Sequence, residues 1–309
     1  MKVKLFVAGL LLSMANGYAQ KGVDDGSRFG KGEDSVRCVQ SLNQLSVDIK
    51  SENYPDAEKA FGIVYSECPR CTENLYSIYA PRLFSWKMKN EKDSVKRADI
   101  LNQWIAMYDK QIKYYGGSLR NPEGWVIGEK AKVYFNHINR ADLKAVKQAY
   151  EWYKKSMELQ KERTDLSVLV GIMETSDLIL KKDATHKEQF MKDFMAVSTS
   201  LDEMEKAESK GEAGPDGPGN MNPNRDQDKP GDMNPNRGQD RPEGVNSNRG
   251  QDRPEGRGQD RPEGMNPNRG NSKLEELDRA KGFINQIFAT SSAASCETLA
   301  EIYGPQVEA

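Results

Sequence analysis

The sequence predicts an all-α protein: a run of helical hairpins, a disordered linker of short repeats, and a C-terminal helical segment. Apolar residues recur at steps of three and four over residues 33–206 and again within 273–309, which is the period of a helix that buries one face. Between these regions, residues 207–272 hold almost no apolar side chain and repeat a twelve-residue phrase. We therefore expect three separate parts, with the last helical segment packing back on the first helical region.

Residues 1–19 have the composition of a signal peptide. Met1–Lys4 is short and basic, Leu5–Ala15 is apolar, and Gly17 and Ala19 are small residues at the two positions that signal peptidase inspects. An apolar run of eleven residues is too short to cross a bilayer, which takes about 20. We expect cleavage after Ala19 and an exported, soluble protein of the periplasm or cell envelope with no transmembrane span.

The charge balance argues against two classes of partner. The formal net charge is −2 and the isoelectric point is near 5.9, so no general attraction to nucleic acid or to an anionic membrane follows. The twelve-residue unit is itself nearly neutral, because its two arginines face one aspartate and one glutamate. We expect no nucleic-acid partner.

The periodicity predicts four pairs of helices before the linker. A break at residues 51–53 divides the first pair, Pro81 marks a kink or a late start in the second, and Gly116–Gly117 ends that pair. The third pair covers Trp125–His137 and Ala141–Leu159. The remaining apolar faces are those of Val39, Leu42, Leu45 and Ile49; Tyr54, Ala57, Phe61 and Val64; Tyr76, Tyr79, Leu83 and Trp86; Ile100, Leu101, Trp104, Met107, Tyr108 and Ile112; Leu166, Leu169, Ile172 and Met173; and Phe190, Phe194, Val197 and Leu201.

Two capping signals are visible near the end of the chain. Thr185 and Glu188 have the spacing of a capping box, as do Ser272 and Glu275, and in this motif each side chain satisfies a free backbone N–H of the first helical turn. They predict defined starts for the helix of residues 190–201 and for the helix after the linker.

The linker repeats the phrase Met-Asn-Pro-Asn-Arg-Gly-Gln-Asp-Arg-Pro-Glu-Gly, in complete, varied and shortened copies, from Met221 to Gly270. Without apolar residues, such a segment cannot offset the conformational entropy that ordering costs. We expect it to act as a spacer. A repeated Asn-Pro-Asn-Arg epitope that binds multivalently is the alternative.

The first hairpin matches the second half of a tetratricopeptide repeat over Tyr54-Pro55-Asp56-Ala57, Phe61 and Pro69. Ala57 is the small residue where two helices approach, Phe61 is the aromatic residue four positions later, and Pro69 ends the helix. The chain resembles the exported tetratricopeptide repeat proteins of Bacteroidetes. The other residues that carry this resemblance are Cys38, Cys68, Tyr108, Asp109, Ile112, Tyr114, Tyr115, Gly116, Ala293, Ala294, Cys296 and Tyr303.

The resemblance implies a tetratricopeptide-like α-solenoid, in which stacked hairpins share one core and leave a concave groove lined by the first helix of each pair. Tyr79, Arg82, Trp86 and Trp125 are the groove residues we expect; the alternative is that these aromatics pack between hairpins. The implied function is a scaffold or adaptor for protein–protein interaction in the cell envelope, without a cofactor.

The four cysteines are interpreted as two disulfides. Cys38 begins the first helix and Cys68 ends the second, so in an antiparallel hairpin both lie at the same end, within reach of one bond. Cys71 then pairs with Cys296, which would staple the C-terminal segment to the first hairpin.

Two other uses of the cysteines stay open. Cys68-Pro69-Arg70-Cys71 has the C-x-x-C spacing of a thiol-disulfide oxidoreductase, although it follows the C-terminus of a helix, whereas reactive pairs sit at a helix N-terminus. Zinc bound by all four cysteines is less consistent with an oxidising compartment, and the second close pair is missing.

No other motif predicts catalysis. His137 and His186 are nearly fifty residues apart and outside any H-E-x-x-H pattern, and the many carboxylates alternate with lysines as on a solvated helix face. No phosphate-binding glycine loop or nucleophile elbow is present. We expect no metal site and a protein that is not an enzyme.

Overall fold

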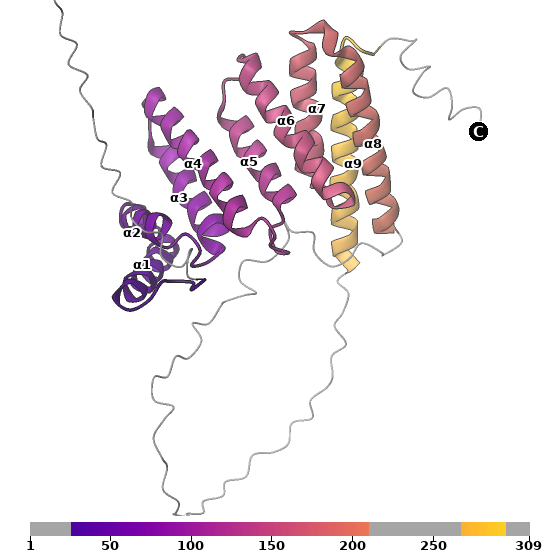
Figure 1. Ribbon diagram of the computed structural model, residues 1–309. Coiled ribbons are helices and arrows are strands. Elements are labelled where there is room, and N and C mark those ends of the chain that lie inside the picture. The colour runs from indigo at the N-terminus through magenta and orange to yellow at the C-terminus, as the bar shows by residue number, and fades with distance from the viewer. Residues whose placement is uncertain (1–25, 210–266, 295–309) are drawn as a thin grey trace, which may run out of the picture. The chain divides into compact units, whose positions relative to one another are not determined.

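The computed structural model describes residues 26–209 and 267–294, and these residues form helices joined by short turns, with no strand among them (Figure 1). The all-α prediction is therefore confirmed for the described part. The α-helices are α1 (Glu33–Lys50), α2 (Tyr54–Glu67), α3 (Ala80–Asn90), α4 (Ser94–Tyr115), α5 (Glu123–His137), α6 (Leu143–Gln160), α7 (Leu166–Leu180), α8 (Lys187–Ser209) and α9 (Pro267–Thr290). Three short turns complete the order: η1 (Leu75–Tyr79, a π-helix), η2 (Lys161–Arg163) and η3 (Ala184–His186).

The chain divides into two compact units. Unit 1 ends at Asp193 and unit 2 begins at Phe194, so the division falls inside α8. The helical domain predicted over residues 33–206 spans this division.

In unit 1, helices that follow each other along the chain pack together from α1 to α7 (Figure 1). The continuous core runs from Cys38 to Val126 in the first four helices and α5. Three helix starts are set by aspartates that the sequence did not single out: Asp93, Asp142 and Asp165 each accept a hydrogen bond from a backbone N–H of the first turn, which satisfies donors that have no partner inside the helix.

Pro81 lies at the second position of α3, where its missing N–H costs no hydrogen bond. The α-helix begins only at Ala80, after the π-helical turn η1, so the late start predicted at Pro81 is confirmed. Tyr76 in this turn is fully buried, and its hydroxyl donates to the carbonyl of Pro69 at 2.7 Å. That bond ties the start of the second pair to the end of the first.

α5 lies very close to its neighbours because of two glycines one turn apart. A Cβ on Gly124 would lie 2.8 Å from Leu159 Cβ, and one on Gly128 would lie 2.7 Å from Ser156 Oγ. The Ser156 hydroxyl also donates to the carbonyl of Gly124 at 2.8 Å. A side chain at either glycine would force α5 away from α6, so these positions determine where the opposite face of α5 points.

In unit 2, α9 packs antiparallel to the Phe194–Ser209 part of α8. The rings of Phe194 and Phe288 stack at 4.1 Å, and Lys281 pairs with Asp202 at 2.8 Å. The remaining buried contacts come from Val197, Leu201, Leu277 and Ile284. α9 therefore has its own apolar partner within this unit.

Both predicted capping boxes differ from the structure. Asp183 takes the place of Thr185, since its carboxylate accepts from the Thr185 N–H and begins η3 ahead of α8. α9 begins at Pro267, where proline suits the first helical turn, so Ser272 lies inside the helix. Residues 267–272, assigned to the linker from their lack of apolar residues, are helical.

Several predictions fall outside the described residues: the signal peptide 1–19, the repeats over 210–266, and the segment 295–309 with Cys296 and Tyr303. Within the described helices, none is long and apolar enough to cross a membrane.

Candidate functional site

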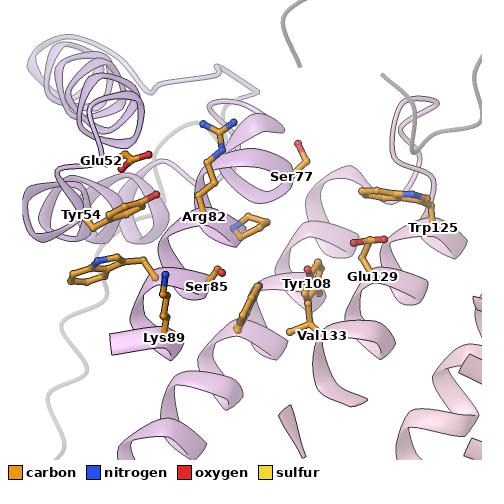
Figure 2. Close-up of a pocket in the computed structure, with 13 residues that line it drawn as sticks. Glu52, Tyr54, Ser77, Arg82, Ser85, Lys89, Tyr108, Trp125, Glu129 and Val133 are labelled. Atoms are coloured by element: carbon orange, nitrogen blue, oxygen red, sulfur yellow. The ribbon is translucent and has the colours of Figure 1, made fainter. Parts of the chain in front are cut away.

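Unit 1 contains a groove of about 800 Å³ that we call the α3–α5 groove (Figure 2). α3 lines one side and α5 the other, and two residues of α4 lie between them; Tyr54, the first residue of α2, closes one end. The lining residues are Glu52, Tyr54, Ser77, Pro81, Arg82, Ser85, Trp86, Lys89, Trp104, Tyr108, Trp125, Glu129 and Val133.

The α3 side presents cations beside an aromatic platform. Arg82, Trp86 and Lys89 follow at steps of four and three and so share one face of the helix. The ring of Trp86 stacks on that of Tyr54, with centroids 5.3 Å apart and planes 13° from parallel. Both rings are only half-buried, which leaves flat apolar surface open to a ligand.

The α5 side repeats at steps of four: Trp125, Glu129 and Val133. The indole nitrogen of Trp125 is buried and has no hydrogen-bond acceptor among the described residues. Glu129 pairs with Lys132 on its own helix at 2.5 Å. This side therefore offers one unused N–H donor beside a carboxylate.

The groove floor belongs to the core. Trp104 is 5% exposed and Tyr108 is 4% exposed, and the Trp104 ring stacks on Phe84 of α3 at 5.8 Å. Burial raises the pKa of the Tyr108 phenol above its ordinary range, so this hydroxyl stays protonated. A rigid floor holds the two sides of the groove in place.

The turn between α4 and α5 is anchored to the segment before η1. The Glu73 carboxylate accepts from Asn121 Nδ2 at 2.7 Å and from Ser118 Oγ at 3.0 Å. Arg120 donates to the Asn74 side-chain oxygen at 2.9 Å. Because η1 continues into α3, these bonds link the two helices that line the groove.

The charges on the groove are mixed, and several are unpaired. Arg82 and Lys89 are exposed and have no ion-pair partner within the described residues. Glu52 is also exposed and occupies a left-handed backbone conformation, with φ of 60°. The groove can therefore accept both acidic and basic groups.

The structure brings three of the four predicted groove residues together: Arg82, Trp86 and Trp125 line the same groove. Tyr79 does not line it, and its hydroxyl instead donates to Ser46 Oγ of α1 at 3.2 Å. The sequence reading missed Tyr54, which looked like a repeat-consensus core residue, and Glu129, whose four-residue spacing from Trp125 could have identified it.

Three of the four cysteines, Cys38, Cys68 and Cys71, lie in the core of the first hairpin. The structure joins Cys38 and Cys68 in a disulfide with a Cα separation of 6.1 Å. The bond closes a loop of 30 residues, which by the chain-entropy estimate stabilises the fold by about 3–4 kcal/mol. The predicted partner of Cys71, Cys296, lies outside the described residues.

Cys71 is not arranged as a reactive thiol. It is fully buried and has no disulfide among the described residues. Burial raises the pKa of its thiol to about 12, although Arg28 lies nearby and its Nε donates to the Cys71 carbonyl at 2.8 Å. A nucleophilic cysteine needs the opposite shift, toward the thiolate, so this geometry disfavours the C-x-x-C oxidoreductase.

A second polar cluster surrounds Asp193, which is fully buried. Its Oδ2 accepts from Tyr150 and from Ser176, each at 2.8 Å, and its Oδ1 accepts from Lys154 at 2.7 Å and from Gln189 at 2.9 Å. We call these groups the Asp193 cluster. They join α6, α7 and the first turns of α8.

The Asp193 cluster includes a serine and a histidine, but not in a catalytic order. Ser176 Oγ lies 2.9 Å from His186 Nε2, and Asp193 bonds to the serine and not to the histidine. In a hydrolytic triad the carboxylate orients the histidine and the serine faces the substrate. Ser176 is fully buried, so the cluster holds helices together.

Within the described residues, no three histidine, cysteine, aspartate or glutamate side chains gather closely enough to hold an ion. His137 packs its ring 5.8 Å from Trp104, and burial lowers the pKa of its imidazole.

Comparison with known proteins identifies no relative. No family model matches this chain, no curated protein matches its sequence, and no solved structure matches it.

Proposed function

We propose that this protein is an exported tetratricopeptide-repeat-like scaffold whose α3–α5 groove binds an extended segment of a partner protein in the cell envelope. The observation that carries the proposal is the groove itself. Its two sides are the first helices of consecutive pairs, α3 and α5, and exposed parts of Tyr54 and Trp86 face it. This is where a solenoid of stacked hairpins offers its concave surface.

The size and chemistry of the groove favour a peptide. A volume near 800 Å³ matches ordinary ligand sites, which combine apolar rings with a few polar groups. Extended peptides also carry unpaired backbone carbonyls, and the buried N–H of Trp125 is a donor without an acceptor. Side-chain charges of either sign can pair with Arg82, Lys89 or Glu52 on the rim.

Site-specific photo-cross-linking in the native cell tests this proposal. A photoreactive amino acid at Arg82 is expected to capture one protein through one contiguous segment, and Trp86→Ala in the same chain is expected to abolish the capture. The matched control position is Val95 of α4, which is 76% exposed and lies nine residues, or half a helical rotation, from Trp104.

Equal capture from position 95, or capture at position 82 that survives Trp86→Ala, would contradict a binding role for the groove. Export is tested separately, by sequencing the N-terminus of the protein recovered from the periplasmic fraction. A mature chain that begins at Gln20 is the expected result.

A further inference from the structure

The linker contains a short motif with the chemistry that the α3–α5 groove lacks. Asp-Arg-Pro-Glu-Gly occurs three times, at residues 240–244, 252–256 and 260–264. Each copy combines a proline ring, one cation between two carboxylates, and a glycine that allows close backbone approach. We propose that the groove binds this motif of its own chain, so that the isolated protein covers the surface that its partner uses.

The aromatic platform fits the proline of the motif. Tyr54 and Trp86 form a nearly flat pair of stacked rings, with centroids 5.3 Å apart, and Pro81 lines the same groove. Proline-rich segments dock in aromatic-lined grooves because their backbone is already extended and little entropy is lost on binding. In the motif, arginine precedes the proline and glutamate follows it, so a charged side chain lies on each side of the proline ring.

The unpaired charges of the groove complement the motif in number and sign. Arg82 and Lys89 have no ion-pair partner within the described residues, and each can pair with one carboxylate of the motif. Glu52, on the exposed rim of the groove, can form an ion pair with the arginine of the motif.

The backbone of the motif supplies an acceptor for Trp125. An extended chain forms no internal backbone hydrogen bonds, so its carbonyls are free. The Trp125 indole N–H is buried against the groove without an acceptor among the described residues. A buried donor left unpaired costs about 1–3 kcal/mol, and a bound carbonyl removes that cost.

Tethering makes even weak binding effective. The segment 210–266 is roughly 60 residues long and spans up to roughly 200 Å when extended, so its length does not keep the motif from the groove. A tethered ligand on a linker of this kind experiences an effective concentration near the millimolar range. Three copies of the motif raise it further, so an intrinsic Kd of about 1 mM is enough for substantial occupancy.

Indole N–H signals in the NMR spectrum of the full chain test this inference. Of the four tryptophans, Trp86, Trp104 and Trp125 line the groove, and Trp152 does not. The test variant replaces the motif arginines with serine: Arg241→Ser, Arg253→Ser and Arg261→Ser. The matched control makes the same three changes elsewhere in the linker: Arg225→Ser, Arg237→Ser and Arg249→Ser.

We expect the Trp86 and Trp125 signals to shift between wild type and the test variant, with Trp152 unchanged and the control spectrum the same as wild type. Added peptide Gly-Gln-Asp-Arg-Pro-Glu-Gly should move the test variant back toward the wild-type spectrum. It should bind wild type on the order of 2–10-fold more weakly than the test variant, because the tethered copies compete.

Identical groove signals in wild type, test variant and control would overturn the inference. So would shifts that disappear on dilution, since those would mean binding between two copies of the chain. The inference rests on the proposed function, but the two can fail separately. If the peptide does not bind while cross-linking from position 82 still captures a partner, only the self-binding is wrong.

Discussion

Two buried polar regions of unit 1 differ in how completely their hydrogen bonds are satisfied. In the Asp193 cluster, one buried carboxylate accepts four hydrogen bonds, from Tyr150, Ser176, Lys154 and Gln189. Around α4 and α5, polar atoms stay unpaired: the Trp125 indole nitrogen, and both side-chain atoms of Gln111, which is fully buried, have no partner among the described residues.

The difference separates a structural region from a binding region. A buried carboxylate is tolerated only when it is paired and hydrogen-bonded, and the Asp193 cluster meets that condition with donors from three helices. Folding alone gives no reason to bury a donor without an acceptor near an open groove. Of the unpaired atoms named above, only the Trp125 nitrogen belongs to a residue that lines the α3–α5 groove, so an outside group is expected there.

The largest expected effect is in the complete region. Asp193→Ala removes the acceptor that the hydroxyls of Tyr150 and Ser176 share and leaves both hydroxyls buried. We therefore expect the free energy of unfolding to fall by about 3–5 kcal/mol. Urea denaturation measures this. Asp202→Ala, at an exposed carboxylate that pairs with Lys281, is the control and should cost less than about 1 kcal/mol. Similar losses in both variants would mean that the cluster has no special role.

A substitution at Gln111 is expected to increase the free energy of unfolding. Gln111→Leu replaces an unpaired buried amide by an apolar side chain of similar size, so the free energy of unfolding should rise by about 1–2 kcal/mol. The same denaturation experiment checks it. Gln103→Leu on the exposed face of α4, where the amide already bonds to Asp99, should change little. A destabilised Gln111→Leu would show that this amide has a partner in solution.

A smaller effect on stability is expected at the groove. Trp125→Phe removes an N–H that has no acceptor together with part of a half-buried ring, so stability should fall by only about 1 kcal/mol. The affinity for the Asp-Arg-Pro-Glu-Gly peptide should nevertheless fall about five- to tenfold, as expected for the loss of one hydrogen bond. Isothermal titration with the linker test variant measures it, and an unchanged affinity would exclude Trp125 as a donor to the ligand.

The smallest effect is a loss of stability in acid. Burial lowers the pKa of His186 from 6.5 in the folded chain, although Asp193 opposes the shift. The unfolded chain then binds the proton more readily, so the stability is fully present above the unfolded pKa and is lost as pH falls through the folded one. We expect the urea midpoint to decrease from pH 7 to pH 5, and His186→Gln to weaken that dependence. His137 shifts in the same direction, so some dependence should persist. If the urea midpoint of His186→Gln depends on pH as it does in wild type, His186 does not contribute to the loss of stability in acid.

Part of the candidate site could be predicted from sequence, because stacked hairpins line a groove with the first helix of each pair. That rule, taken from the resemblance to tetratricopeptide repeats, led to Arg82, Trp86 and Trp125, and all three line the groove. Tyr79 was assigned to the same face because periodicity assumes an α-helix from Tyr76 onward. The π-helical turn before Ala80 changes the residues per turn, and Tyr79 contacts Ser46 of α1 instead.

The starts of the helices were also predicted only in part from the sequence. An aspartate at an N-cap can be read from sequence, yet Thr185 and Ser272 were chosen from the capping-box spacing, because that pattern is local and common. The structure prefers Asp183 in the first case and begins α9 at Pro267 in the second. Propensity and spacing rank the candidates, whereas packing of the whole helix selects among them.

The sequence by itself determined the helical class, the order of the pairs and the faces that are buried, because all of these follow from the 3.6-residue period and from breaks in it. Only the tertiary structure decided which polar groups meet. Asp193 finds donors 17 to 43 residues away, and Glu73 binds residues 45 and 48 positions later. Contacts over such separations depend on how helices pack against one another, and a short sequence window carries no record of that packing.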